Sequence, residues 1–372
     1  MQKKLIAVAV LGACVAGSAL AANVDVYGRI DTGLSYVHQK IGDQAGTDTL
    51  SMDSGLSSAS RWGLKGSEDL GNGYQVGFVL EGGFSSDTGA LGAGGIFGRE
   101  ATLRVSGPFG SIYAGRMGRI GSDAGSVGFY AGSVSPFGSG WGEMAGHFAV
   151  TANYDSRYNN ALAYVSPKVG PVTVYAQYTM GNTTENESGD DRLFSLGAQA
   201  DFGALQVLGL VEYLNKQSTV AGTAGAPNVT HNDSQYDDSY TINLGGSYDF
   251  GVAKVFLAGQ YFNAAPNFAG QGGDWTESFD GFGVNVGASA PIGAGEFLVS
   301  AGYGKGDYHL DTKDTNLSAD SYIFQVGYTY PFSKRTNLYA GAGYHQTTME
   351  EEASKDSKTK TTQVMFGLLH MF

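Results

Sequence analysis

The fold can be predicted from a stretch that reads Y-T-I-N-L-G-G-S-Y-D-F from Tyr240 to Phe250. Its large apolar residues fall on every second position, with polar residues and glycines between them. This period of two predicts a β-strand with one apolar and one polar face. The same alternation recurs at 172–178, 194–202, 282–288 and 322–332. Because no stretch after residue 23 keeps a helical period, we predict an all-β chain.

The connections between these runs differ in length at their two ends. We count about sixteen runs. Tight connections at 69–73, 107–108, 167–170, 201–204 and 331–334 alternate with long, polar ones at 181–191, 216–237, 264–278, 304–320 and 349–360. This asymmetry is typical of a membrane barrel with short periplasmic turns and long extracellular loops. We therefore predict a roughly 16-stranded antiparallel transmembrane β-barrel, closed because a membrane cannot hydrate an open sheet edge.

Aromatic residues near the ends of the runs fit the same architecture. They would form the girdles that flank the apolar band of a membrane barrel; examples are Tyr36, Phe84, Tyr178, Tyr213, Tyr261, Tyr303 and Phe332. The alternative is a soluble β-sandwich, which also alternates apolar and polar residues. The number of runs and the asymmetric turn lengths favour the barrel.

The composition agrees with one large β domain. Of 372 residues, 58 are Gly, 22 are Tyr and 20 are Phe, whereas only 15% are charged. Such sparse charge does not fit a disordered acidic chain, and glycine without a triplet period excludes collagen. The formal net charge of −13 makes nucleic acid an unsuitable partner.

Residues 1–21 are predicted to be a signal peptide. Lys3 and Lys4 precede a short apolar stretch, and Ala19-Leu20-Ala21 supplies a cleavage site of the A-x-A type. Cleavage would leave residues 22–372 as one barrel domain and would lower the formal charge by two, to −15.

The lone cysteine leaves an alternative open at the leader. Leu11-Gly12-Ala13-Cys14 resembles a lipoprotein processing site, at which Cys14 would become the lipidated first residue. With the cleavage after Ala21 the mature chain has no cysteine, so its stability must come from sheet closure and packing rather than from disulfides.

The end of the chain carries a second signal. Val364, Phe366, Leu368, His370 and Phe372 fall on one face of the last run. An alternating strand that ends in Phe372 resembles the assembly signal of outer-membrane barrels. The opposite face is also apolar, with Met365, Leu369 and Met371, which suggests packing against a loop that folds inward.

Several motifs together resemble one family. The chain reads V-D-V-Y-G-R-I-D at 24–31, S-R-W-G-L-K-G-S-E-D-L-G-N-G at 60–73, F-G-R-E-A at 97–101, G-P-F-G-S-I-Y-A-G-R at 107–116 and Y-D-S-R-Y-N-N-A-L-A-Y at 154–164. These motifs are similar to those of the trimeric general porins of Gram-negative bacteria, of the beta-proteobacterial and neisserial type. The resemblance covers residues 24–372 and implies a homotrimeric outer-membrane channel for ions and small hydrophilic solutes.

The resemblance also implies which residues narrow the pore. A loop at 118–154 would fold into the lumen as a constriction loop, with Asp123 and Glu143 as its acidic residues and Pro136, Phe137 and Gly138 as structural ones. The basic residues opposite would be Arg29, Arg61 and Arg99, with Lys65, Arg116 and Arg157 as weaker candidates. The alternative is that these are ordinary lumen charges, neutralised by Asp31, Glu81 or Glu100.

The alternation tests part of this assignment independently. On the first strand Arg29 lies opposite the apolar face, and an arginine that faced lipid at mid-depth would cost about 2–4 kcal/mol. On the second strand Trp62 and Leu64 face outward, so Arg61 and Lys65 face the lumen. Arg99 shares its parity with apolar residues, and its assignment therefore rests on the resemblance alone.

Other partners implied are outer-membrane lipid, lipopolysaccharide and, through the last strand, the barrel-assembly machinery. No cofactor or metal site is predicted. A barrel enzyme would need a converging nucleophile and base, and no motif such as G-x-S-x-G stands out, so we predict no enzymatic activity; an adhesin is a further, less favoured alternative. A sugar- or anion-specific channel stays open, because Phe129, Tyr130, Phe137, Trp141 and Phe148 could either form an aromatic slide or hold the loop to the wall.

The charge preference of the channel is not decided by the sequence. The net charge of −15 gives a small preference for cations, whereas three arginines at the constriction, the waist of the channel, favour anions. Loop charges are screened over about 8–10 Å at physiological salt, so charges at the waist have the larger influence.

Overall fold

The structure, a computed structural model, describes residues 23–92, 94–141, 150–180, 192–215, 219–220, 229–230, 238–269, 271–272, 277–310, 313–351 and 356–372. The predicted signal peptide, Cys14, Glu143 and Phe148 lie outside these residues. Within them, no helix is long and apolar enough to span a bilayer.

Strands account for most of the described chain. The first half holds β1 (Asn23–Ile41), β2 (Thr47–Ser54), β3 (Arg61–Gly71), β4 (Tyr74–Gly83), β5 (Glu100–Gly107), β6 (Gly110–Gly118), β7 (Arg157–Val165), β8 (Val172–Thr179), β9 (Arg192–Phe202) and β10 (Leu205–Asn215). The second half holds β13 (Ser239–Asp249), β14 (Lys254–Ala265), β17 (Glu277–Ile292), β18 (Gly295–Leu310), β19 (Lys313–Ser333), β20 (Thr336–Glu351) and β21 (Ser357–Met371). Short pieces are β11 (Thr219–Val220), β12 (Val229–Thr230), β15 (Asn267–Phe268), β16 (Gln271–Gly272) and the 3₁₀ turn η1 (Ala131–Ser133).

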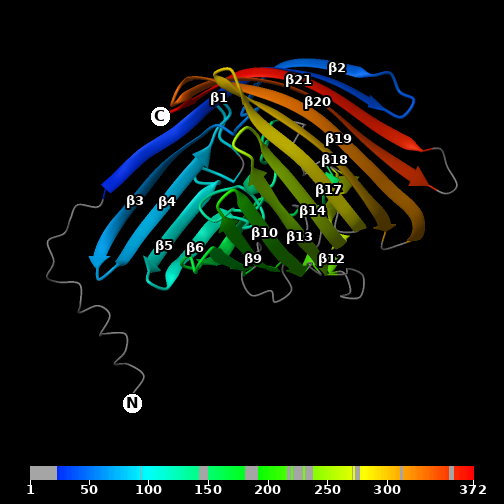
Figure 1. Ribbon diagram of the computed structural model, residues 1–372. Coiled ribbons are helices and arrows are strands. Elements are labelled where there is room, and N and C mark those ends of the chain that lie inside the picture. The colour runs from blue at the N-terminus through cyan, green and yellow to red at the C-terminus, as the bar shows by residue number, and fades with distance from the viewer. Residues whose placement is uncertain are drawn as a thin grey trace.

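The barrel closes on itself. Neighbouring strands pair antiparallel along the chain, and β21 pairs back to β1 (Figure 1). The first half of β1 pairs with β3 and its second half with β2, so that β2 and β3 together occupy one strand position. The described residues thus form the closed 16-stranded antiparallel barrel that the sequence predicted.

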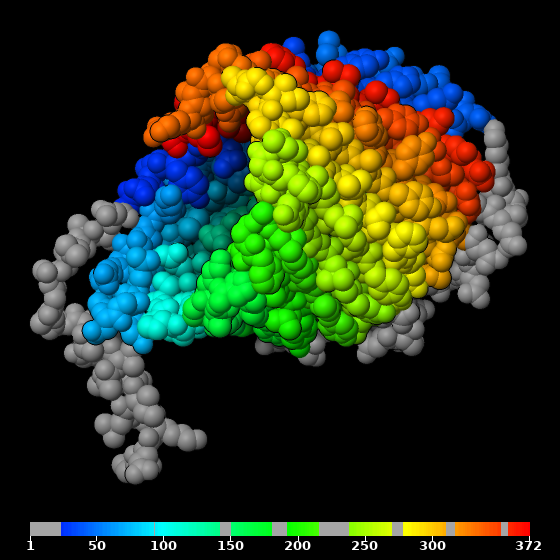
Figure 2. All heavy atoms as spheres, viewed as in Figure 1, coloured from blue at the N-terminus to red at the C-terminus, as the bar shows by residue number. Residues whose placement is uncertain are grey.

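The two faces of the sheet have the polarity expected in a membrane. On β13, Ile242 and Leu244 are 42% and 65% exposed on the outside, whereas Thr241 and Asn243 are buried inside. In a soluble protein the apolar face would be buried and the polar face exposed. The opposite polarity here fits an apolar outer band that contacts lipid. A hollow opens between the first strands, in blue, and the yellow and green strands (Figure 2).

Two expectations about the loops need correction. Most of 304–320 and 349–360 is strand rather than loop. The strand β18 continues to Leu310 and β19 begins at Lys313, while β20 continues to Glu351 and β21 begins at Ser357. The segment 264–278 also does not simply project outward. Phe268 is fully buried with Phe262 and Phe279, and the Asn267 side chain accepts a hydrogen bond of 3.0 Å from the Asn153 backbone.

Phe372 completes the seam of the barrel. Its backbone N–H donates to the Gly28 carbonyl at 3.1 Å, and the Gly28 N–H donates to the Phe372 carbonyl at 3.1 Å. The Phe372 side chain is 46% exposed. Its role as an assembly signal remains a prediction.

Candidate functional site

The first two barrel strands place a pair of arginines on the inner wall. Arg29 on β1 lies directly opposite Arg61 on β3, and like charges in that position repel. Ser58 lies between them and accepts hydrogen bonds from Arg29 Nη1 at 2.7 Å and from Arg61 Nη2 at 3.4 Å. Glu81 Oε1 lies 3.8 Å from Arg61 Nη1, which offsets part of the repulsion.

A buried carboxylate fixes the position of Ser58. Asp31 is completely buried and accepts hydrogen bonds from Ser57 N at 3.0 Å, Ser57 Oγ at 2.8 Å and Ser58 N at 2.7 Å. The hydroxyl of Tyr339 also donates to it. Asp31 therefore fixes the loop between β2 and β3 against the inner wall, so that Ser58 can accept hydrogen bonds from Arg29 and Arg61. In the described chain, Asp31 itself forms no ion pair with these arginines.

The structure explains why the parity of Arg99 is misleading. The strand β5 begins at Glu100, so Arg99 belongs to the preceding loop and its side chain is not bound by the alternation. Arg99 Nε donates to Glu81 Oε1 at 2.7 Å. Arg157 Nε in turn donates to the Arg99 carbonyl at 3.0 Å.

These arginines surround one cavity of about 670 Å³. Its wall includes five guanidinium groups, from Arg29, Arg61, Arg99, Arg119 and Arg157. Among the described lining residues, Asp123 supplies the one carboxylate. It accepts a hydrogen bond of 3.1 Å from the Ser139 backbone and another from the Ser139 hydroxyl. Arginine stays protonated in proteins. Because Arg61 and Arg99 share Glu81 and Arg119 pairs with Glu212, the described groups leave the cavity wall with a smaller net positive charge.

Three of the predicted residues do not reach this cavity or cannot be placed. Arg116 is turned away and donates to the Gly98 carbonyl at 2.7 Å and to Asn159 Oδ1 at 2.6 Å. Lys65 lines a different pocket. Glu143 lies outside the described residues.

Arg119 is a residue that the sequence did not single out. It is 4% exposed, pairs with Glu212 of β10 and lies 5.6 Å from the centre of the Tyr154 ring. Burial raises the pKa of Tyr154 above its ordinary value, so the ring meets the guanidinium as a neutral π-face. Arg119 follows β6 in an irregular segment, where no periodicity could have assigned its direction.

The segment between β6 and β7 lies on glycines of the inner wall. A Cβ added at Gly287 would come 2.6 Å from Pro136, and one at Gly327 would come 3.0 Å from Phe137. Gly138 has φ +58°, which suits the turn that brings Ser139 to Asp123. The strand glycines therefore make room for the segment.

The aromatic residues of the segment pack against the wall, and Phe137, Trp141 and Tyr154 among them also border the cavity. Phe137 and Trp141 are 4% and 5% exposed, with ring centres 5.3 Å apart, and Trp141 lies 5.6 Å from Tyr339. Met365 and Leu369 of β21 pack in the same cluster, as the apolar inner face of the last strand suggested. Phe129 stacks on Tyr175 at 4.1 Å.

Known proteins resemble the chain over its whole length. Residues 7–349 match the family described as Gram-negative porin. An outer membrane porin protein of Bordetella pertussis is 34% identical over all of both chains. Outer membrane porin protein 32 of Delftia acidovorans is 31% identical over 60% of this chain and 72% of its own length.

Solved structures agree with the sequence matches. The anion-selective porin from Comamonas acidovorans has a TM-score of 0.67 and 26% identity, over 95% of this chain and all of that one. OmpT of Vibrio cholerae, in a trimer form, has a TM-score of 0.60 at 17% identity, over 95% of this chain and all of that one, and supports the fold alone. With the closed barrel and the family match, the chain belongs to the Gram-negative porins and forms an outer-membrane channel for the passive diffusion of ions and small hydrophilic solutes.

Proposed function

We propose that the arginine-lined cavity is the constriction of this channel and that it passes small anions in preference to cations. The observation that carries the proposal is the charge of the cavity wall, where the described lining residues supply five guanidinium groups and one carboxylate, that of Asp123. Glu81 adds a second negative charge behind Arg61 and Arg99, and Glu212 adds a third beside Arg119, so the described groups keep a net positive charge. Rings of fixed charge set ion preference by their local field.

The overall negative charge does not oppose this proposal. Charges in the external loops lie beyond the waist and are screened over about 8–10 Å at physiological salt, whereas the arginines border the path itself. The local charge therefore reverses the small preference for cations drawn from the net charge. The anion-selective character of the Comamonas acidovorans porin supports the same direction.

A general diffusion channel fits better than a substrate-specific one. The described aromatic residues of the segment 119–156 are at most 8% exposed. Although Phe137, Trp141 and Tyr154 border the cavity, they present little free ring face to a sugar. We extend the proposal to the quaternary structure: the chain assembles as a homotrimer, as one solved protein of this fold does, in contact with outer-membrane lipid and lipopolysaccharide. Phe372 would engage the barrel-assembly machinery, and no catalytic role is assigned.

The experiment is a single-channel recording of purified protein in a planar bilayer under a tenfold KCl gradient. The proposal predicts ohmic steps that close in threes and a zero-current potential whose sign corresponds to chloride permeation. A zero-current potential of the opposite sign would overturn the charge assignment. Conducting protein without grouped closures would overturn the trimer.

A further inference from the structure

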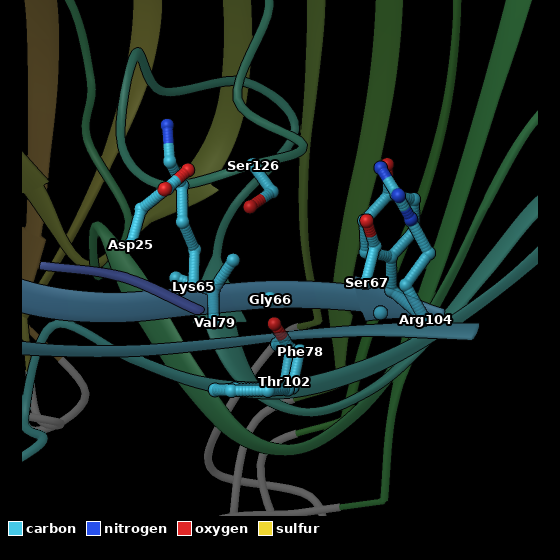
Figure 3. A pocket seen from close by; sticks show the side chains of 11 residues that line it. Asp25, Lys65, Gly66, Ser67, Phe78, Val79, Thr102, Arg104 and Ser126 are labelled. Carbon is cyan, nitrogen blue, oxygen red and sulfur yellow. The ribbon is translucent and has the colours of Figure 1, made fainter. Parts of the chain in front are cut away.

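A second positively charged pocket lies on the inner wall between the waist and the short turns. It has a volume of about 340 Å³ and takes residues from β1, β3, β4, β5 and β6, with Ser126 above it from the segment between β6 and β7, here called the inner segment. In Figure 3, Asp25 and Lys65 rise on one side of the pocket, and Arg104 and Ser67 lie on the other. The pocket is therefore open to the lumen and shares no lining residue with the waist cavity.

The strand register gives its distance from the waist. Lys65 follows Arg61 by four residues on β3 and lies opposite Asp25 of β1 in the strand register. At about 3.4 Å per residue, Lys65 lies roughly 14 Å further along the strand. That distance exceeds the screening length of about 8 Å at physiological salt, so an ion at one position repels an ion at the other only weakly.

Neither cation of the pocket forms an ion pair within the described chain. Within the described chain, Lys65 Nζ has no ion pair or hydrogen bond, and its recorded contact is the Tyr27 ring at 5.3 Å. Arg104 donates from Nη2 to the neutral Gln75 side chain at 2.6 Å, and its buried Nε has no partner there. Among the described residues that line the pocket, Asp25 is the one acidic residue. Glu100 lies behind the wall and accepts hydrogen bonds from Thr102 and Ser126.

The local backbone makes this arrangement possible. Gly77 of β4 lies opposite Arg104 of β5, and a Cβ at Gly77 would come 3.2 Å from Arg104 Nη2. The glycine therefore lets the guanidinium lie across β4. Ser67 and Tyr113 add hydroxyl groups to the wall, which can donate to an anion.

We propose that this pocket is a second anion-binding station of the channel, which takes small oxyanions such as phosphate or carboxylates after they pass the waist. The inference rests on the proposed anion preference and adds a site to it. Its volume is about eleven times the roughly 30 Å³ that one water molecule occupies in the liquid, so an oxyanion fits with part of its hydration shell. Weak binding at successive sites speeds conduction, since each site must also release its ion.

The test is block of chloride current by inorganic phosphate added to one side of the bilayer at a time. In the wild-type channel, phosphate on the short-turn side should block at a lower concentration than phosphate on the loop side. Lys65→Gln and Lys65→Gln/Arg104→Gln should each raise the half-blocking concentration from the short-turn side, the double variant by about tenfold. Lys65→Gln alone keeps the test valid if the double variant does not fold, because Lys65 is exposed to the lumen.

The control is Lys168→Gln, which removes the same charge from a short turn where Lys168 pairs with Asp201 at 3.2 Å. It should leave the phosphate block unchanged. Equal block in wild type and in both Lys65 variants, with anion preference intact, would overturn the second station and leave the proposed function standing. A cation preference of the wild-type channel in KCl would overturn the proposed function itself, whatever the phosphate result.

Discussion

The ion pair between Arg119 and Glu212 is expected to be a main anchor of the segment that fills the barrel. The two side chains are 5% and 1% exposed, and Glu212 also accepts a hydrogen bond from Ser195 Oγ at 3.1 Å. Arg119→Met would leave the Glu212 carboxylate buried without its partner. Removal of one member of such a pair costs about 3–5 kcal/mol.

The assay is the free energy of unfolding in detergent, from guanidinium titration followed by tryptophan fluorescence. Arg119→Met should lower it by about 3–5 kcal/mol, and Arg119→Met/Glu212→Met should recover much of that loss because no charge stays buried. The matched control is Lys168→Met, which breaks an exposed pair with Asp201 and should cost at most about 1 kcal/mol. The reasoning is refuted if Arg119→Met and Lys168→Met lose the same stability.

Three further substitutions test the charge at the waist and the packing of the inner segment on the barrel wall. Glu81→Gln should raise the chloride-to-potassium permeability ratio by roughly sevenfold, since a unit charge about 7 Å away in water is worth roughly 0.6 kcal/mol, which opposes chloride and favours potassium; an unchanged zero-current potential would contradict this. Trp141→Ala should cost about 3–5 kcal/mol of unfolding free energy and give noisier open-channel current, and a quiet, fully stable channel would argue against anchoring. Gly287→Ala, whose new Cβ would meet Pro136 at 2.6 Å, should change the unit conductance, whereas Gly259→Ala, with its nearest atom at 4.0 Å, should not.

Much of the barrel could be predicted because its strands obey a strict physical rule. A closed sheet in lipid must alternate apolar and polar residues, and the alternation around Arg29 and Arg61 assigned both to the lumen correctly. The inner apolar residues Met365 and Leu369 indicated a partner inside the barrel, and they pack against Trp141.

The parts that could not be predicted lie where the alternation stops. Arg99 stands one residue before β5, and Arg119 follows β6 in an irregular segment, so neither direction could be obtained from periodicity. The break that presents Ser58 to the arginines depends on Asp31, a contact across 27 positions of sequence. Glycines such as Gly287 have no side chain to indicate a face, and only the structure shows what packs on them.

The most direct test of the account compares two triple variants that change the net charge equally. Arg29→Gln/Arg61→Gln/Arg99→Gln removes three charges from the waist cavity. Lys40→Gln/Lys358→Gln/Lys360→Gln removes three from a pocket near the loops that follow β1 and precede β21. In a KCl gradient, the waist variant should lose the anion preference and the lysine variant should keep it. Equal shifts of the zero-current potential in both would show that net charge, and not the arginine waist, controls permeation.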